Sequence, residues 1–179
     1  GIAKIDIAPD GSTRAFGINV SVVTAQGAAT PARVSVRAEG RSGKRKHTVP
    51  VRHYPVTHSS DTAVVEIDYP LGDGALVWDE VSPALYSVTV AVQDEKGREL
   101  DSRVVRSGVR EFVARGTQFV VNGRPVMLRG TLECAIFPLT GYPPTDAASW
   151  RRTYSQCRAF GLNHVRFHSW CPPEAAFAA

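Results

Sequence analysis

Hydrophobic and polar residues alternate along the first part of the chain in short runs with a period of two. Between Phe16 and Thr24, for example, every second side chain is apolar, as in a β-strand with one buried face. Similar runs predict strands at Ile2 to Ile7, Phe16 to Thr24, Ala32 to Ala38, Thr48 to Arg52, Ala63 to Tyr69, Leu85 to Val92 and Glu99 to Arg106. Many short strands separated by turn residues predict an all-β, immunoglobulin-like sandwich over residues 1–110.

The pattern changes after Gly108. Asn122-Gly123 lies between two apolar runs and predicts a β-hairpin from Phe119 to Leu128, because both turn positions favour a positive φ. Thr145 or Asp146 can cap a helix that ends at Gly161. Its apolar positions at near-helical spacing are Trp150, Tyr154, Cys157 and Phe160.

A strand is expected at Asn163 to His168, and Pro172-Pro173-Glu174 predicts the start of a second helix, with proline in the first turn. Strand, helix, strand and helix in this order form a βαβ pattern, which begins a parallel sheet. Residues 111–179 are therefore expected to hold a linking hairpin and the first part of a second domain.

The composition is that of a globular protein. Of 179 residues, 43% are hydrophobic and 21% charged, and 15 Gly with 12 Pro are too few for a disordered chain. No apolar run is long enough to span a bilayer, so we expect no membrane partner. The chain lacks an initiator Met and stops inside what looks like an opening helix, so we expect a fragment of a longer protein.

The basic residues do not predict binding to a nucleic acid. The net charge is +4, but Arg41, Lys44, Arg45, Lys46 and Arg52 all lie in one window without an acid. Neither aromatic residues nor a second basic cluster accompanies this window, as a nucleic-acid surface would require. A solvated hairpin loop is the preferred interpretation.

Candidate chemistry gathers on the strand at Asn163 to His168. Alternation places Val165 and Phe167 on one face, and His164, Arg166 and His168 on the other. Arg166 and His168 lie at the carboxyl end of the strand, where α/β barrels bind their substrates. From position alone, a substrate site and a simple ion pair of Arg166 with a carboxylate inside the barrel have equal weight.

A metal site is not expected. His164, His168 and Cys171 are zinc-ligand types, but the fixed positive charge of Arg166 between them would repel a dication. The three cysteines are too few and too irregular for a disulfide framework or a CxxC metal knuckle, so free thiols are predicted. No cofactor is expected.

Three other groups are of the residue types found in catalytic or binding sites. Glu174 is explained by its helix N-terminus, whereas Glu133 is a candidate ligand contact at the open end of the sheet. The run from His58 to Asp61 contains the residue types of a catalytic triad, but adjacency in sequence does not assemble one, so a turn is predicted.

Four segments match a known pattern in order and spacing. They are Trp78 with Ser82-Pro83-Ala84-Leu85-Tyr86, Gly108 to Phe112, Phe119 to Gly130, and Gly161 to His168. Together they resemble glycoside hydrolase family 2, which includes β-galactosidases, β-glucuronidases and β-mannosidases. The resemblance implies a sandwich followed by the start, the first two βα units, of a (β/α)8 TIM barrel with strands at about Val126 to Leu132 and Asn163 to His168.

The resemblance also implies a role for each candidate residue. Arg166 matches the arginine that holds the nucleophilic glutamate in this family, while His168 and Trp170 would lie near the innermost sugar subsite. The commoner pattern has a histidine three residues after the arginine, where this chain has Ser169, which leaves the role of His168 open. The run from Leu132 to Pro144 departs from better-known β-galactosidases and suggests a divergent subgroup of unknown sugar specificity.

The implied activity is hydrolysis of β-glycosides by a retaining, exo-acting enzyme with two glutamates. Eight βα units need about 240 residues, so both glutamates are expected outside this chain, which by itself should be inactive. The expected partners are a carbohydrate substrate and the remainder of the barrel. The alternative is a non-catalytic carbohydrate-binding or adhesion sandwich, and a parent that has lost its glutamates is a third option. The sequence does not define the cellular compartment, and both a periplasmic and a secreted location are compatible with it.

Overall fold

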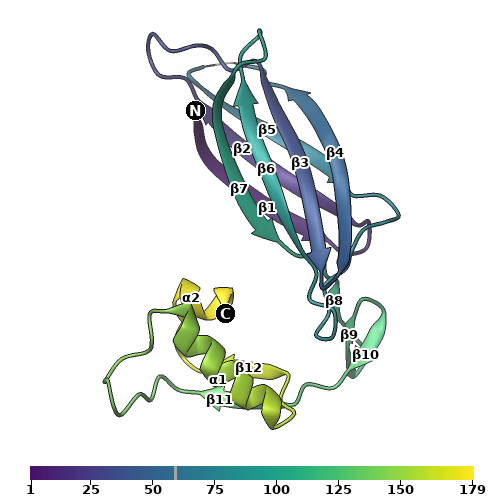
Figure 1. Ribbon diagram of the computed structural model, residues 1–179, viewed down its shortest axis with the longest axis vertical. Helices are drawn as coiled ribbons and strands as arrows, with labels where there is room; N and C mark the ends of the chain where they lie inside the picture. The colour runs from purple at the N-terminus through teal and green to yellow at the C-terminus, as the bar shows by residue number, and fades with distance from the viewer. Residues whose placement is uncertain (59) are drawn as a thin grey trace. The chain divides into compact units, whose positions relative to one another are not determined.

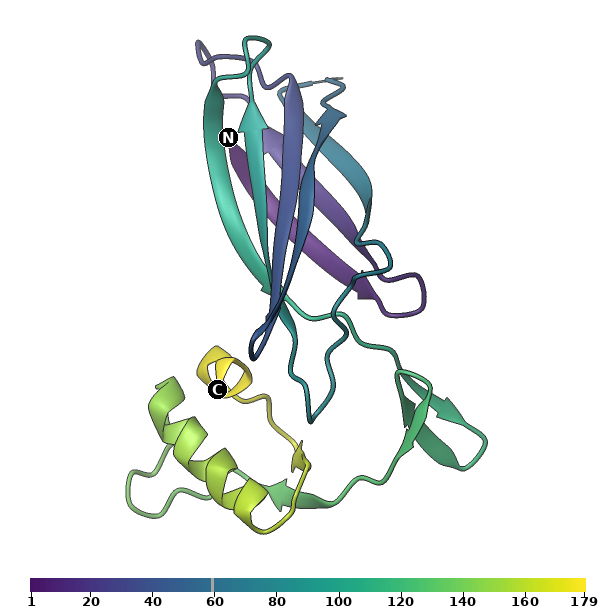
Figure 2. The same ribbon diagram turned by 45° about the vertical axis from the view of Figure 1, so that its right-hand side comes forward.

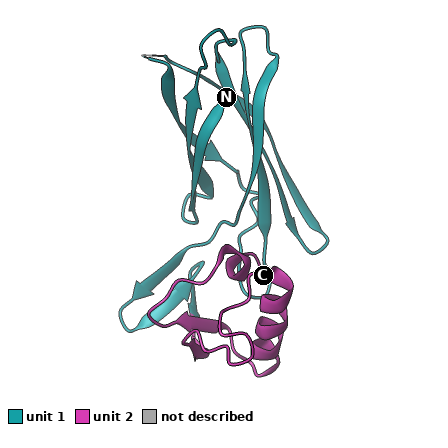
Figure 3. Ribbon diagram, turned by 90° about the vertical axis from the view of Figure 1, so that its left-hand side faces the viewer, with its two compact units in different colours: residues 1–125 teal, residues 126–179 magenta. Residues whose placement is uncertain are grey.

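The computed structural model describes residues 1–58 and 60–179. They form two compact units, residues 1–125 and residues 126–179, which are described separately (Figure 3). Ser59, within the turn expected from His58 to Asp61, lies outside the described residues. Neither α-helix of the described residues is long and apolar enough to cross a membrane.

The first unit contains a sandwich of two antiparallel sheets (Figures 1 and 2). One sheet has the strand order β1-β2-β5 and the other has the order β4-β3-β6-β7. The strands are β1 (Ile2–Asp10), β2 (Ala15–Val23), β3 (Arg33–Ser42), β4 (Arg45–Pro55), β5 (Thr62–Pro70), β6 (Leu85–Gln93) and β7 (Glu99–Ser107). Each of the strands expected from alternation is present, which confirms the sandwich.

Strand β4 pairs with β3. In the constant-type immunoglobulin order it would instead pair with β5, in the other sheet. Only Gly43 and Lys44 separate β3 from β4, and Gly43 has a φ of 57°, as a tight hairpin turn requires. A two-residue connection keeps β4 beside β3. The basic window therefore lies on a hairpin, as predicted, and Lys46 pairs with Glu39 at 3.8 Å.

The core lies between the two sheets and consists of the apolar faces of their strands. The side chains of Phe16, Val36, Tyr69 and Tyr86 are completely buried, and the Phe16 and Tyr86 rings meet edge to face at 5.6 Å. Alternation along β2 puts its remaining polar side chains on the outer face. This core is built entirely from the first unit.

A three-stranded hairpin sheet completes the first unit. Its strands are β8 (Phe112–Arg115), β9 (Gln118–Val121) and β10 (Arg124–Val126), in the order β10-β9-β8. Asn122 and Gly123 have φ angles of 48° and 78°, which confirms the predicted turn. Val126, expected to open the first barrel strand, is instead the last residue of β10, because the hairpin continues through Pro125.

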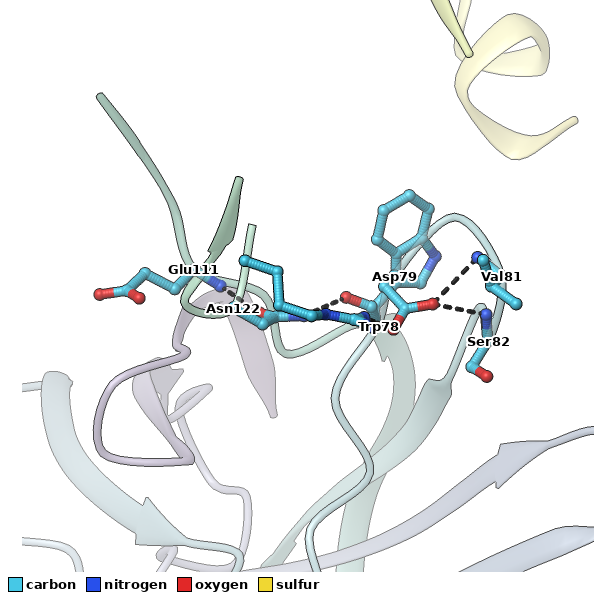
Figure 4. A network of polar contacts seen from close by, with 7 residues as sticks. Trp78, Asp79, Val81, Ser82, Glu111 and Asn122 are labelled. Atoms are coloured by element: carbon cyan, nitrogen blue, oxygen red, sulfur yellow. Dashed lines mark hydrogen bonds and ion pairs between the residues drawn. The ribbon is translucent and has the colours of Figure 1, made fainter. Parts of the chain in front are cut away.

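Polar contacts fasten this hairpin to the loop that precedes β6 (Figure 4). The Asn122 side chain accepts a hydrogen bond from the Glu111 backbone N–H at 3.0 Å and donates one to the Trp78 carbonyl at 2.8 Å. Arg124 pairs with Asp79 at 2.6 Å. The backbone N–H groups of Ser82 and Val81 donate to Asp79 and hold the pKa of its carboxyl below the usual range, with a further contribution from Arg124.

The second unit contains β11 (Gly130–Glu133), α1 (Ala147–Ala159), β12 (His164–Phe167) and α2 (Glu174–Ala178). β11 and β12 are parallel, with α1 between them in the chain, so the βαβ pattern is confirmed. The first of these strands begins later than expected, at Gly130.

Helix α1 begins at its predicted cap, with Asp146 accepting from the Ser149 N–H at 2.8 Å. Trp150 is its buried residue, and Cys157 is half-buried. Phe160, expected on the same stripe, is 85% exposed, because it is the C-cap residue and no longer follows the helical turn.

Candidate functional site

The candidate site lies at the carboxyl end of the two-stranded parallel sheet. The register pairs Leu132 with Arg166 and Glu133 with Phe167, so both strands end together. His168 follows directly, and its backbone N–H donates to the Glu133 carbonyl at 2.8 Å. The predicted residues Glu133, Arg166 and His168 are therefore brought to the same edge of the sheet.

The two faces of this sheet differ. Val165 and Phe167 are half-buried, and the Phe167 ring lies 5.9 Å from that of Trp150 in α1. His164 and Arg166 are exposed on the opposite face, as alternation predicted. Because residues paired in register share a face, Leu132 lies on the exposed face with Arg166.

Arg166 has no carboxylate partner among the residues that the structure describes: the ion pairs found there involve Lys4, Lys46, Arg98 and Arg124. The simpler interpretation, a structural ion pair with a neighbouring acid, thus has no support within the described residues. The guanidinium carries a fixed charge and a planar set of donors suited to a carboxylate.

Glu133 lies on the opposite face from Arg166. It shares the face of Phe167. Burial raises the pKa of Tyr154 in α1, and the charges of Cys157 and Glu133 add to this rise. The Glu133 Oε1 accepts from the Ala135 N–H at 2.9 Å, while Oε2 is buried without a hydrogen-bond partner. The first contact stabilises the turn after β11, where Ala135 has a φ of 58°. A ligand contact of Glu133 stays a prediction.

His168 and Trp170 both contact the carbonyl of Glu133. The Trp170 indole N–H donates to it at 3.4 Å, in addition to the backbone bond from His168. The His168 ring is exposed and its Nδ1 lies 3.1 Å from the Ser169 hydroxyl, while Ser169 has a φ of 61°. These contacts fix the backbone after β12 and leave the imidazole at the open edge.

An aromatic cluster beneath the site was not anticipated as a unit. It consists of Phe137, Trp150, Tyr154, Phe167 and Trp170, with ring centroids 5.4 to 6.5 Å apart. Trp150 also donates its indole N–H to the Pro144 carbonyl at 2.8 Å. This bond anchors the Pro- and Gly-rich loop of residues 138–144 to α1. The four-residue spacing of Trp150 and Tyr154 was a signal in the sequence, but the contacts of Phe137 and Trp170 were not.

Metal ligands do not converge at this edge. Within residues 1–58 and 60–179, no group of three or more His, Cys, Asp or Glu side chains is arranged to hold an ion. Cys134 and Cys171 are exposed free thiols, and Cys157 is a half-buried one. The edge instead offers the guanidinium of Arg166 on the exposed face of the sheet, where it suits an anionic group, while the aromatic cluster packs on the opposite face.

Relatives of known activity match about half of this chain. A β-galactosidase of Photobacterium profundum is 30% identical over 89 residues, which are 50% of this chain and 8% of that enzyme. A β-galactosidase of Thermoanaerobacter pseudethanolicus is 33% identical over 96 residues, which are 52% of this chain and 13% of that enzyme. The chain thus spans a small fraction of the length of these relatives.

Solved structures share the fold over nearly the whole chain. A glycosyl hydrolase family 2 member from Bacteroides cellulosilyticus superposes with a TM-score of 0.73 at 17% identity, covering 99% of this chain and 24% of its own. A β-glucuronidase of Bifidobacterium dentium, solved with coumarin-3-O-glucuronide, superposes with a TM-score of 0.65 at 22% identity, covering 96% and 27%.

The family model for glycosyl hydrolases family 2 matches residues 2–110, which is more than half of the chain. The matched range holds the complete sandwich, β1 to β7. The resemblance found in the segments from Trp78 to His168 is therefore confirmed by independent matches to sequence and structure. This chain belongs to glycosyl hydrolases family 2.

Proposed function

We propose that this chain is part of a retaining, exo-acting β-glycosidase, of the β-galactosidase or β-glucuronidase kind, whose two catalytic glutamates lie outside these 179 residues. Membership in glycosyl hydrolases family 2 supports the glycosidase, and relatives named β-galactosidase and β-glucuronidase support the substrate class. The substrate would be a carbohydrate β-glycoside. No cofactor enters this proposal.

The domain organisation follows from the same proposal. Residues 1–110 would be the sandwich domain, and residues 111–179 the linking hairpin with the first two βα units of a (β/α)8 barrel. The order β11, α1, β12 and α2, with parallel strands, supports a barrel beginning there. The remainder of the barrel would cover exposed apolar side chains such as Leu132 and Phe177, which are 53% and 71% exposed.

Arg166 carries the proposal for the site. It lies exposed at the end of a parallel strand without a carboxylate partner in the described part of the chain. Beside a nucleophilic glutamate, its charge would favour the ionised carboxylate and orient it toward the anomeric carbon. His168, Trp170 and Glu133 would line or support the innermost sugar subsite, and no residue of this chain would perform the covalent step.

Hydrolysis of aryl β-glycosides tests this function. The purified 179-residue chain and the enzyme that contains it would be assayed on galactoside, glucuronide and mannoside substrates. We expect the longer enzyme to hydrolyse one of them with retention of anomeric configuration, read by NMR, and the chain alone to hydrolyse none. Turnover by the chain alone, lost on substitution of one of its own carboxylates, would overturn the proposal.

The alternative of a non-catalytic carbohydrate-binding or adhesion module predicts a different result. It would show glycan binding by the 179-residue chain and no hydrolysis by the longer protein. The parallel unit of β11, α1 and β12 gives no support to it, because a sandwich used only for adhesion does not need a second, unfinished sheet.

A further inference from the structure

We propose that Asn163 is a positioning residue, which sets the register of β12 against β11 and thereby places Arg166 on the exposed face of the sheet. This inference rests on the proposed function for the role of Arg166. Asn163 would hold the Arg166 guanidinium in place through the backbone of β12, and would itself contact neither substrate nor nucleophile.

The side chain of Asn163 bridges two peptide groups of the segment before β11. Its Oδ1 accepts from the Arg129 backbone N–H at 2.8 Å, and its Nδ2 donates to the Met127 carbonyl at 3.1 Å. The backbone N–H of Asn163 also donates to the Arg129 carbonyl at 2.9 Å. The side-chain amide donates and accepts at the same time, so the two contacts fix the alignment of Asn163 with this segment.

Arg129 connects the same point to the end of α1. Its Nε donates to the Gly161 carbonyl at 2.8 Å, and Gly161 has a φ of 75°. The Leu162 N–H in turn donates to the Cys157 carbonyl at 3.0 Å, which closes the helix end. The start of β12 is therefore held both to the helix that precedes it and to the segment that precedes its partner strand.

The next pair along the strands tolerates little displacement. Gly130 pairs with His164, and a Cβ at Gly130 would lie 2.9 Å from the His164 Cδ2 and 3.3 Å from its carbonyl oxygen. A side chain at this position would have to displace the His164 ring and would crowd its carbonyl oxygen. The bridge by Asn163 and the close approach at Gly130 thus act on consecutive positions of the ladder.

Register decides which face carries Arg166. In the observed register Arg166 is paired with Leu132 on the exposed face. A slip by one residue would turn every side chain of β12 to the opposite face. Arg166 would then lie against the aromatic cluster around Trp150, while Phe167 would be exposed, so the slip would remove the cation from the site.

The test uses the enzyme that contains this chain, with Asn163→Ala, Asn163→Asp and Arg166→Met, and with Asn19→Ala as a matched control. Asn19 is an exposed asparagine on β2, far from this sheet in sequence. The readout is the acidic limb of kcat/KM against pH, which reports ionisation of the free enzyme's essential carboxylate. Loss of a nearby cation raises the pKa of a carboxyl group, so the limb moves to higher pH.

We expect Asn163→Ala to move this limb in the same direction as Arg166→Met and to lower kcat by up to about 100-fold with little change in KM. Asn163→Asp keeps the acceptor for Arg129 and should recover part of the loss. If Arg166→Met moves the limb and both Asn163 variants leave it in place, the inference is overturned while the proposed function stands. If Arg166→Met itself leaves the limb in place, the proposed role of Arg166 fails and this inference with it.

Hydrogen exchange gives a second readout that does not depend on activity. The Arg129 amide lies outside the β-ladder, and its acceptor is the Asn163 side chain. We expect this amide to be protected in the wild-type enzyme and to exchange fast in Asn163→Ala. Fast exchange in the wild type would overturn the bridge, even if the variants fail to fold.

Discussion

At the scale of single residues, two polar side chains stabilise backbone that would otherwise lack partners. Asn122 adopts a φ of 48°, a region that asparagine tolerates better than most residues, and its amide satisfies groups on two other segments. Asp146 caps α1 through Ser149. Both are positions where a conservative-looking substitution should have a measurable effect.

Replacing Asn122 by Ala is expected to lower the free energy of unfolding of the first unit by about 1–3 kcal/mol, because the Glu111 N–H and the Trp78 carbonyl lose their partner. Asn122→Gly keeps the backbone conformation and removes only the amide, so it should also destabilise. Urea unfolding followed by tryptophan fluorescence measures both, with Asn19→Ala as a control expected to change little. A Gly variant as stable as the wild type would show that only the backbone angle matters.

Acid should weaken the start of helix α1. The Ser149 N–H and hydroxyl, which donate to Asp146, lower the pKa of this carboxyl. A lowered folded-state pKa gives stability that is present above the unfolded value of about 3.9 and lost as pH falls through the folded value. NMR titration of the Ser149 amide should show this loss, and Asp146→Ser, a cap without a titrating group, should remove it. An unchanged titration in Asp146→Ser would contradict the assignment.

At the scale of elements, local patterns predicted more than pairings did. The period of two in the run from Phe16 to Thr24 gave β2 because the pattern depends on neighbouring residues alone, and Asn122-Gly123 gave the hairpin for the same reason. Local patterns do not show which sheet β4 joins or which face Glu133 occupies, because both depend on strand pairing. Contacts such as Asn122 to Trp78, 44 residues apart, have no local signal.

Alkaline pH should destabilise the sandwich through its buried tyrosines. Burial raises the pKa of Tyr69 to about 12, and also raises the pKa of Tyr86. Because the unfolded value is about 10, stability is complete below it and declines as pH rises toward the folded value. Urea midpoints across this range should fall, and less so in Tyr69→Phe. An equal decline in Tyr69→Phe would assign the effect to other groups.

At the scale of the whole molecule, burial is unequal between the two units. The buried apolar residues of the second unit are Trp150, Pro172 and Ala176, whereas the first unit buries the inner faces of its two sheets against each other. A small apolar core contributes little stability, since stabilisation grows with the area removed from water. The second unit also exposes Phe160 and Phe177.

In the isolated 179-residue chain, amides of residues 126–179 should therefore exchange with solvent faster than those of β2, β3 and β6. Hydrogen exchange with mass spectrometry measures both sets in one sample. The longer enzyme is the matched comparison, and there the protection of β11 and β12 should rise. Equal protection of the two units in the isolated chain would contradict this expectation.

The most direct test of the account is the effect of Arg166 on catalysis in the enzyme that contains this chain. Arg166→Met is compared with Arg151→Met, which removes an exposed arginine from α1 without touching the sheet edge. We predict that kcat/KM for the preferred aryl β-glycoside falls by about 10²–10³-fold in Arg166→Met and stays near the wild-type value in Arg151→Met. Equal activity of the two variants would contradict the placement of the site at the end of β12.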